Sequence, residues 1–155
     1  MPNPVKAIPD GCSGAIPYLR VKGAVDALAF YQKAFGAVET MRLLMPGGTV
    51  GHAEFKINDA VVMLSEEFPD MGIVGPATLG NTSVGLAIHV ENVDAAFDKA
   101  VAAGAEVKKP VADQFYGDRS GGVKDACGNQ WWMATHVEDV SPEEIARRMA
   151  AGPKH

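Results

Sequence analysis

The chain has 155 residues, 47% of them hydrophobic and 21% charged, which suits one compact domain or two very small ones. Its formal net charge is −5 and its basic residues are scattered, which argues against a nucleic-acid partner. No apolar run approaches membrane-spanning length and no hydrophobic leader segment stands at the start, so we expect a cytoplasmic protein with no membrane partner.

The first half of the chain predicts one βαβββ module over residues 15–66. Residues 1–14 precede it and, with three prolines and two glycines, predict a flexible arm. Apolar residues at helical spacing indicate the helix, which Gly36 ends. The strand, the helix and the three further strands are expected at 15–21, 24–35, 37–45, 50–57 and 60–65.

The second half predicts the same order of elements over residues 83–137. Residues 67–82 connect the halves and are rich in Gly, Pro and polar side chains, which is typical of a linker or a mobile lid. The elements of the second module are expected at 83–90, 92–103, 105–112, 116–124 and 130–136. Residues 138–155 predict a short helix and tail, because Ser141-Pro142-Glu143-Glu144 is a capping box with proline at the first helical position.

The two halves also share sequence. Val25-Asp26-Ala27 recurs as Val93-Asp94-Ala95, and Gly36-Ala37 recurs as Gly104-Ala105, at one common offset. A duplicated sheet unit is expected to place its second copy against its first. The sequence therefore predicts the α+β class, with two tandem βαβββ modules that form a curved mixed sheet around a cavity, plus the C-terminal helix.

Strand alternation predicts which side chains face away from the helices. The functional candidates on that face are Tyr18, Arg20, His52, Glu54, Met63 and His89. In the last strand the pattern leaves open whether Trp132 and His136 or Trp131 and Met133 share this face. Large apolar groups mixed with a few polar ones are typical of a small-molecule cavity, and the alternative is a core packed between two sheets.

The chain resembles the vicinal oxygen chelate superfamily, also called the glyoxalase/bleomycin-resistance/dioxygenase superfamily, and within it the PhnB-like subgroup. The paired βαβββ units carry this resemblance together with a set of motifs: Phe30-Tyr31-x-x-x-Phe35-Gly36, Gly51-His52-Ala53-Glu54, Asp113-x-Phe115-Tyr116-Gly117-Asp118-Arg119, Asp125-x-x-Gly128-Asn129 and Ala134-Thr135-His136. Members commonly pair as homodimers, so the resemblance implies a homodimer here.

Metal-dependent members of this superfamily hold a divalent ion with four His, Gln or Glu ligands from the first and last strands of each unit. The resemblance places these positions at Ile16, Met63, Gly85 and Trp132, and none of these residues ligates a hard divalent cation. We therefore expect no metal cofactor at these positions and no activity by the metal-dependent family mechanism. A relocated metal site built from His52, Glu54, His89 and His136 is the alternative.

The predicted function is that of a glyoxalase/bleomycin-resistance-like protein that binds and sequesters a small organic ligand without a metal. The candidate ligand-binding residues are Tyr18, Arg20, Met63, His89, Phe115, Tyr116 and Trp132. One alternative is a lyase- or isomerase-type enzyme that uses a relocated divalent metal, or Glu54 and His52 as an acid–base pair. A second alternative is a structural protein with a vestigial cavity.

Overall fold

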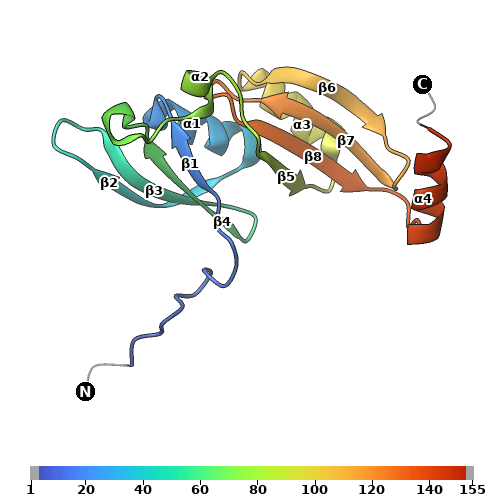
Figure 1. The fold of residues 1–155 in the computed structure, drawn as a ribbon, viewed down its shortest axis with the longest axis horizontal. Helices are drawn as coiled ribbons and strands as arrows, with labels where there is room; N and C mark the ends of the chain where they lie inside the picture. The colour runs from blue at the N-terminus through green and yellow to red at the C-terminus, as the bar shows by residue number, and fades with distance from the viewer. Residues whose placement is uncertain (1–3, 153–155) are drawn as a thin grey trace. The chain divides into compact units, whose positions relative to one another are not determined.

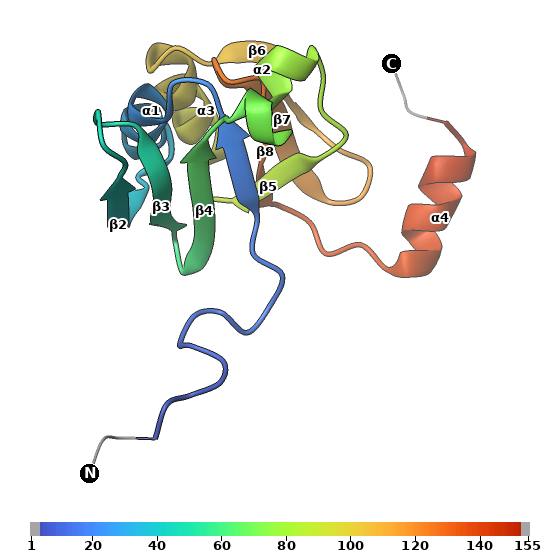
Figure 2. The same cartoon turned by 60° about the vertical axis from the view of Figure 1, so that its left-hand side comes forward.

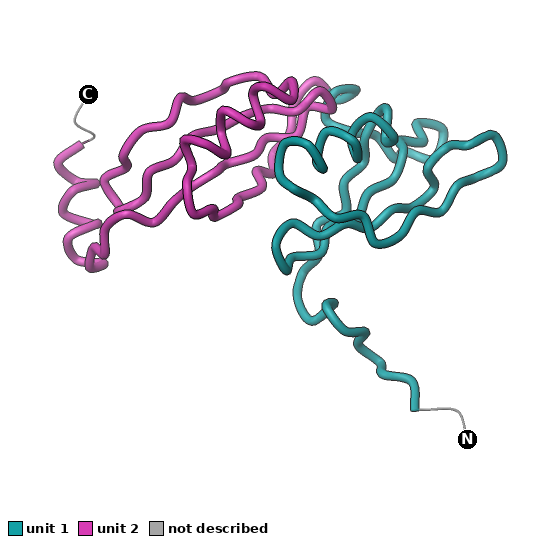
Figure 3. The backbone as a smooth tube through the Cα atoms, turned by 180° about the vertical axis from the view of Figure 1, so that it is seen from behind, with its two compact units in different colours: residues 1–79 teal, residues 80–155 magenta. Residues whose placement is uncertain are grey.

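The computed structural model describes residues 4–152, which form two compact units that divide between Leu79 and Gly80 (Figure 3). Each unit contains one βαβββ module with its own four-stranded mixed sheet (Figure 1). The tandem modules, the α+β class and the C-terminal helix expected from the sequence are thereby confirmed. None of the helices in residues 4–152 is long and apolar enough to cross a membrane.

The first unit contains a sheet with strand order β1-β4-β3-β2, in which β1 is parallel to β4 and the other neighbours are antiparallel. Its elements are β1 (Tyr18–Val21), α1 (Ala24–Phe35), β2 (Val38–Leu44), β3 (Val50–Ile57) and β4 (Ala60–Glu66). Helix α1 packs Leu28 and Tyr31 onto the sheet, and the ring of Tyr31 stacks on Phe55 at 5.2 Å between centroids. Gly36 ends α1 in the left-handed conformation, as predicted.

Strand β1 begins at Tyr18, three residues later than the expected strand at 15–21. The physical reason is Pro17, which has no backbone N–H to add to a ladder. Its carbonyl still accepts a hydrogen bond from the N–H of Met63, at 2.9 Å. Ile16 therefore lies outside the strand, and Tyr18 is the residue of β1 that pairs with Met63.

The segment 67–82 contains more local structure than its composition predicts. It includes the 3₁₀ helix η1 (Pro69–Met71), the short helix α2 (Pro76–Leu79) and a bridge between Phe68 and Ile73. The carboxylate of Glu67 accepts hydrogen bonds from the N–H of Gly75 and the hydroxyl of Thr78, and these bonds lower the pKa of Glu67. A Cβ on Gly75 would lie 2.4 Å from the carbonyl oxygen of Arg20, so this glycine permits the close approach of the segment to β1.

The second unit repeats the arrangement with strand order β5-β8-β7-β6, where β5 is parallel to β8. Its elements are β5 (Gly85–His89), α3 (Val93–Ala102), β6 (Glu106–Asp113), β7 (Asp118–Lys124), β8 (Gln130–His136) and α4 (Pro142–Ala150). Trp131 and Met133 are buried with Phe97 of α3, at 2% and 1% exposure. This burial settles the ambiguity in the last strand: Trp132 and His136 lie on the face away from α3.

A buried carboxylate organises the turn between β7 and β8. Asp125, 4% exposed, accepts hydrogen bonds through Oδ1 from the backbone N–H groups of Cys127 and Asn129, at 2.9 and 3.0 Å. Its Oδ2 accepts a third bond from the indole N–H of Trp131, at 2.9 Å. One side chain thus satisfies three buried donors that would otherwise lack an acceptor.

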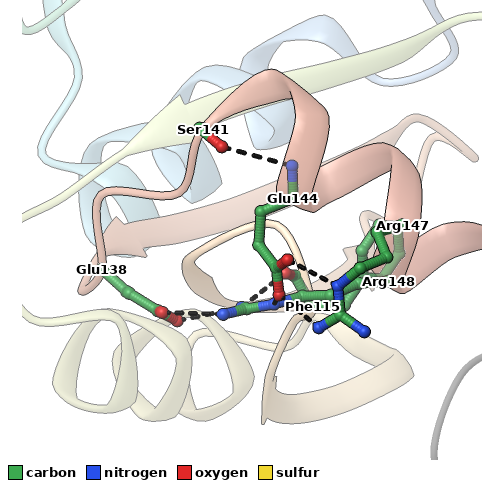
Figure 4. A network of polar contacts seen from close by, with 6 residues as sticks. All are labelled: Phe115, Glu138, Ser141, Glu144, Arg147 and Arg148. Carbon is green, nitrogen blue, oxygen red and sulfur yellow. Dashed lines mark hydrogen bonds and ion pairs between the residues drawn. The ribbon is translucent and has the colours of Figure 1, made fainter.

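Helix α4 is held to the second unit by one arginine (Figure 4). Arg148 donates to the carbonyl of Phe115 at 3.0 Å and to the carboxylates of Glu138 and Glu144. The hydroxyl of Ser141 accepts the N–H of Glu144, which confirms Ser141 as the N-cap. The two neighbouring arginines hold the pKa of Glu144 at about 2.

Candidate functional site

The candidate site of the first unit is the sheet surface turned away from α1, which we call the open face (Figure 2). The side chains of residues that pair across neighbouring strands point to the same side of a sheet. The pairings of Tyr18 with Met63 and of Met63 with Glu54 therefore place these three side chains on one face. The intervening residues Leu19 and Leu64 are buried on the other face. Six side chains of the open face concern the site: Tyr18, Arg20, His52, Glu54, Met63 and Ser65.

Three of these side chains form a hydrogen-bonded chain. The hydroxyl of Tyr18 lies 2.5 Å from Nδ1 of His52, and Nε2 of His52 lies 3.1 Å from Oε1 of Glu54. The partners assign the tautomer, because a carboxylate only accepts: Nε2–H donates to Glu54, and Nδ1 accepts the phenolic proton. His52 and Glu54 are half-buried, with 23% and 26% of their side chains exposed. The predicted acid–base pair is therefore in hydrogen-bond contact and extends to a tyrosine.

Arg20 extends this chain on the other side of Tyr18. Its guanidinium carbon lies 3.8 Å from the centroid of the Tyr18 ring, which is a cation–π geometry. Its NH1 group donates to the hydroxyl of Ser65 at 3.1 Å, and that hydroxyl donates to the carbonyl of Glu66. Alternation of β4 places Ser65 on the same face as Met63, which is the signal that would have identified it as a site residue.

Apolar side chains border this polar cluster. Met41 and Leu43 of β2 pair with Glu54 and His52 of β3, so they share the open face. They are 43% and 56% exposed, while Met63 is half-buried. The sequence alone does not identify these two β2 residues as site residues, because only the register of β2 against β3 places them beside the polar cluster. The open face thus offers an apolar surface next to hydrogen-bonding groups, as binding sites for small organic molecules do.

A hollow of about 380 Å³ in the first unit lies elsewhere. It is lined by the start of α1 and by the hairpin around Gly47 and Gly48, and none of the candidate residues contributes to it. The carboxylate of Glu66 already accepts the N–H groups of Gly23 and Ala24 at this helix end, at 2.7 and 2.8 Å. The positive end of α1 is therefore neutralised by the protein itself.

In the second unit, two candidate histidines meet at one aspartate. Nδ1 of His136 lies 2.8 Å from Asp118, and Nε2 of His89 lies 3.4 Å from the other oxygen of the same carboxylate. Nε2 of His136 also contacts Asp139 at 2.8 Å. These contacts join the ends of β5, β7 and β8. Hydrogen bonds from the His136 ring to the carboxylates of Asp139 and then Asp118, together with their negative charges, raise the pKa of His136.

We predict that His136 titrates above its ordinary value of about 6.5. A raised pKa in the folded state means that protonation of His136 stabilises the fold at pH values below the unfolded pKa, and that this contribution is lost as the pH rises through the folded pKa. An NMR titration of the imidazole protons tests this, and Asp139→Asn is expected to lower the midpoint. A midpoint at or below that of the unfolded chain would contradict the assignment.

The aromatic candidates of the second unit occupy two places. Phe115 and Tyr116 lie in the turn between β6 and β7, where their rings meet edge to face at 5.2 Å. Trp132 lies within β8, and its indole covers Gly122, where an added Cβ would lie 3.0 Å from the ring. Within residues 4–152, neither ring of the turn forms an aromatic pair with Trp132. Lys109 places its ammonium 5.3 Å from the Trp132 ring centroid.

The positions to which the resemblance assigns metal ligands do not fit a divalent metal ion. Met63 offers a thioether, Trp132 an indole, Ile16 an alkyl chain and Gly85 no side chain, whereas divalent metal ions in proteins of this kind take carboxylate or other oxygen ligands, or imidazole nitrogen. The alternative set separates into two pairs, His52 with Glu54 in one unit and His89 with His136 in the other. In the described part of the chain, no three His, Cys, Asp or Glu side chains form a group that could hold a metal.

Comparisons with known proteins agree with this architecture. The model of the Glyoxalase/Bleomycin resistance protein/Dioxygenase superfamily matches residues 15–133. An uncharacterized protein of Mycobacterium bovis is 40% identical over 138 residues, which cover 87% of this chain and 91% of that protein.

Two solved structures share the fold. The PhnB protein of Bacillus cereus has a TM-score of 0.63 at 19% identity, covering 79% of this chain and 99% of that chain. The fosfomycin resistance protein FosX of Listeria monocytogenes has a TM-score of 0.62 at 21% identity, covering 86% and 97%. With the family model spanning most of its length and a relative at 40% identity, this chain belongs to the glyoxalase/bleomycin resistance protein/dioxygenase superfamily.

Proposed function

We propose that the protein binds a small organic molecule on the open face of the first sheet, without a metal ion. The observation that supports this proposal is the cluster of Arg20, Tyr18, His52 and Glu54, in which each side chain contacts the next. Hydrogen-bonding groups placed beside an apolar surface are the combination that orients small organic ligands in binding sites. Sequestration then follows from binding without turnover.

The absence of suitable metal ligands at the positions assigned by the resemblance supports the metal-free part of the proposal. Binding would then depend on hydrogen bonds, charge and the apolar surface of Met41, Leu43 and Met63. Such binding is insensitive to chelators, whereas binding through a metal is lost when the metal is removed.

A methyl-NMR screen tests this function. Small aromatic compounds are added to protein labelled at the methionine methyl groups, with and without EDTA. We expect bound compounds to shift the Met63 resonance equally in both conditions. Met149, which is 65% exposed on α4, is the reference for non-specific contact with exposed methionines, and we expect no shift of its resonance. Tyr18→Ala is expected to weaken binding by about tenfold, since the ring and its hydroxyl are lost together. Shifts that vanish with EDTA, or that follow Met149, would reject the proposal.

A second candidate function, a proton-transfer enzyme, is favoured by the chain from Tyr18 through His52 to Glu54. When a proton is removed from a ligand, the Tyr18 oxygen accepts it while the phenolic proton passes to Nδ1 and the Nε2 proton passes to Glu54. All protons are accounted for, and the negative charge of Glu54 moves to the ligand. Conversion of a bound compound in the same spectra, abolished by Glu54→Gln, would establish this function over simple binding.

We also propose that the protein forms a homodimer, as the resemblance implies. The outer strands of both sheets support it, because an uncovered edge strand offers unpaired backbone groups to a partner. In β2 the apolar residues Val38 and Leu44 are 63% and 58% exposed. Sedimentation of the purified protein distinguishes a dimer of twice the 16.3 kDa chain mass from a monomer.

A further inference from the structure

We infer that the ligand of the open face carries an oxyanion, a carboxylate or a phosphonate, and that Arg20 is the residue that receives it. The inference rests on the proposed binding function and adds to it the chemical class of the ligand. Among the arginines in the described part of the chain, Arg20 is the one without an acidic partner.

The chain contains five arginines, and four of them form ion pairs. Arg42 pairs with Glu39, Arg119 with Asp94 and Asp113, and both arginines of α4 with Glu144. Within residues 4–152, Arg20 alone has no carboxylate partner, although it is half-buried. A partly buried arginine is ordinarily paired with an acid, so this exception points to an anion that the described residues do not supply.

Three acidic residues of the first unit, Glu54, Glu66 and Glu67, have hydrogen-bond partners other than Arg20. The carboxylate of Glu66 accepts the N–H groups of Gly23 and Ala24 at the start of α1. Glu67 accepts from Gly75 and Thr78, and Glu54 contacts His52. These acids have their own partners, which leaves the negative charge opposite Arg20 to be brought by a ligand.

The guanidinium is held in place as an anion receptor requires. Its plane is supported by the Tyr18 ring at 3.8 Å, and one N–H is fixed by the hydroxyl of Ser65, which is itself 2% exposed. Of its five N–H donors, the described residues take one. The planar guanidinium presents two parallel N–H donors, which match two oxygens of a carboxylate or phosphonate. Because the side chain is already held in place, it loses little conformational entropy when the anion binds.

The neighbours of Arg20 define the rest of the ligand. Met41, Leu43 and Met63 give the same face an apolar surface, and the Tyr18 hydroxyl with His52 gives a second polar point. The fitting class is a small organic acid with an apolar body. An inorganic anion would use the fork alone and would gain nothing from the methionines.

The test uses matched probes on the full chain. Benzoate and phenylphosphonate carry the anion, and benzamide is the neutral counterpart of benzoate. Dissociation constants are measured from the shift of the Met63 methyl resonance. We expect at least one anion to bind about tenfold tighter than benzamide, and the tighter of the two anions identifies the head group. Inorganic phosphate is expected to compete only weakly.

Variants of Arg20 and Arg42 separate the possible outcomes. Arg20→Gln is expected to abolish the preference for the anion, and Arg20→Lys to retain only part of it, because an ammonium keeps the charge but not the fork. Arg42→Gln removes the same charge from the opposite face of the same sheet, where Arg42 pairs with Ala53, and should preserve the preference. Equal binding of benzoate and benzamide, unchanged in Arg20→Gln, overturns the anion inference but keeps the binding function. Absence of any shift of Met63 with all probes overturns both.

Discussion

Replacing Asp125 with alanine is expected to lower the free energy of unfolding of the second unit by roughly 3 kcal/mol or more. The carboxylate is 4% exposed and accepts three hydrogen bonds, from the backbone of Cys127 and Asn129 and from the indole of Trp131. Alanine leaves these donors without their acceptor in a space closed to water. Each unsatisfied buried donor costs about 1–3 kcal/mol, so the three together make this one of the most damaging single changes in the chain.

Urea denaturation followed by tryptophan fluorescence measures this effect, because both tryptophans of the chain, Trp131 and Trp132, lie in β8 of the second unit. Circular dichroism on the same samples checks that the signal reports unfolding and not a local change at Trp131. Asp113→Ala is the matched control: it removes an acid that pairs with Arg119 but is 76% exposed, and we expect a loss below about 1 kcal/mol. Similar midpoints for Asp125→Ala and Asp113→Ala would refute the structural role of Asp125.

A double-mutant cycle isolates the hydrogen bond between Asp125 and the indole of Trp131 from the two backbone bonds. Asp125→Asn retains one oxygen for the two backbone donors but can turn an NH₂ group toward the indole N–H of Trp131, so that two donors face each other. Trp131→Phe removes the indole N–H. We expect Trp131→Phe to cost less stability in the Asp125→Asn background than in the wild-type chain, with a coupling of about 1 kcal/mol or more. Strict additivity of the two changes would show that the indole bond contributes nothing.

The secondary structure of this chain follows closely from local sequence, because each signal has a local physical cause. The Gly36 stop, the Ser141 N-cap and the alternation in 50–57 act within a few residues, and the structure confirms them. The exception in the first strand has an equally local cause in Pro17. Val25-Asp26-Ala27 recurs at positions 93–95, so the elements of the first module predicted the same order of elements in the second.

The contacts of the site depend on strand register, which alternation alone does not determine. Alternation predicted that Tyr18 and His52 share a face, but their 2.5 Å contact requires β1 and β3 to lie on either side of β4. The burial of Asp125 was missed for a related reason. An Asp-x-x-Gly turn is ordinarily solvent-exposed, and only the inward-facing indole of Trp131 makes its carboxylate part of the core.

Gly117→Ala is the second change for which we expect a large effect, a loss of roughly 3 kcal/mol in the second unit. Gly117 has φ of 103°, which L-residues rarely adopt, and an added Cβ would lie 2.1 Å from the carbonyl oxygen of Glu138. The carbonyl of Gly117 also accepts the N–H groups of Val137 and Glu138, at 2.9 and 3.0 Å. Glu138 lies in the segment that leads from β8 to α4. The clash therefore forces this segment and the turn at Gly117 apart.

Gly104→Ala isolates the backbone part of this cost. Gly104 has φ of 113° in the same unit, but its Cβ position has no neighbour within 4 Å. We therefore expect Gly104→Ala to cost only about 1–2 kcal/mol from the strained φ. Hydrogen exchange adds a local readout: Gly117→Ala should accelerate exchange in α4, because displacing Glu138 weakens its ion pair with Arg148, while Gly104→Ala should leave α4 protected. Equal losses in the two variants would mean that the close approach of Gly117 to Glu138 contributes nothing to stability.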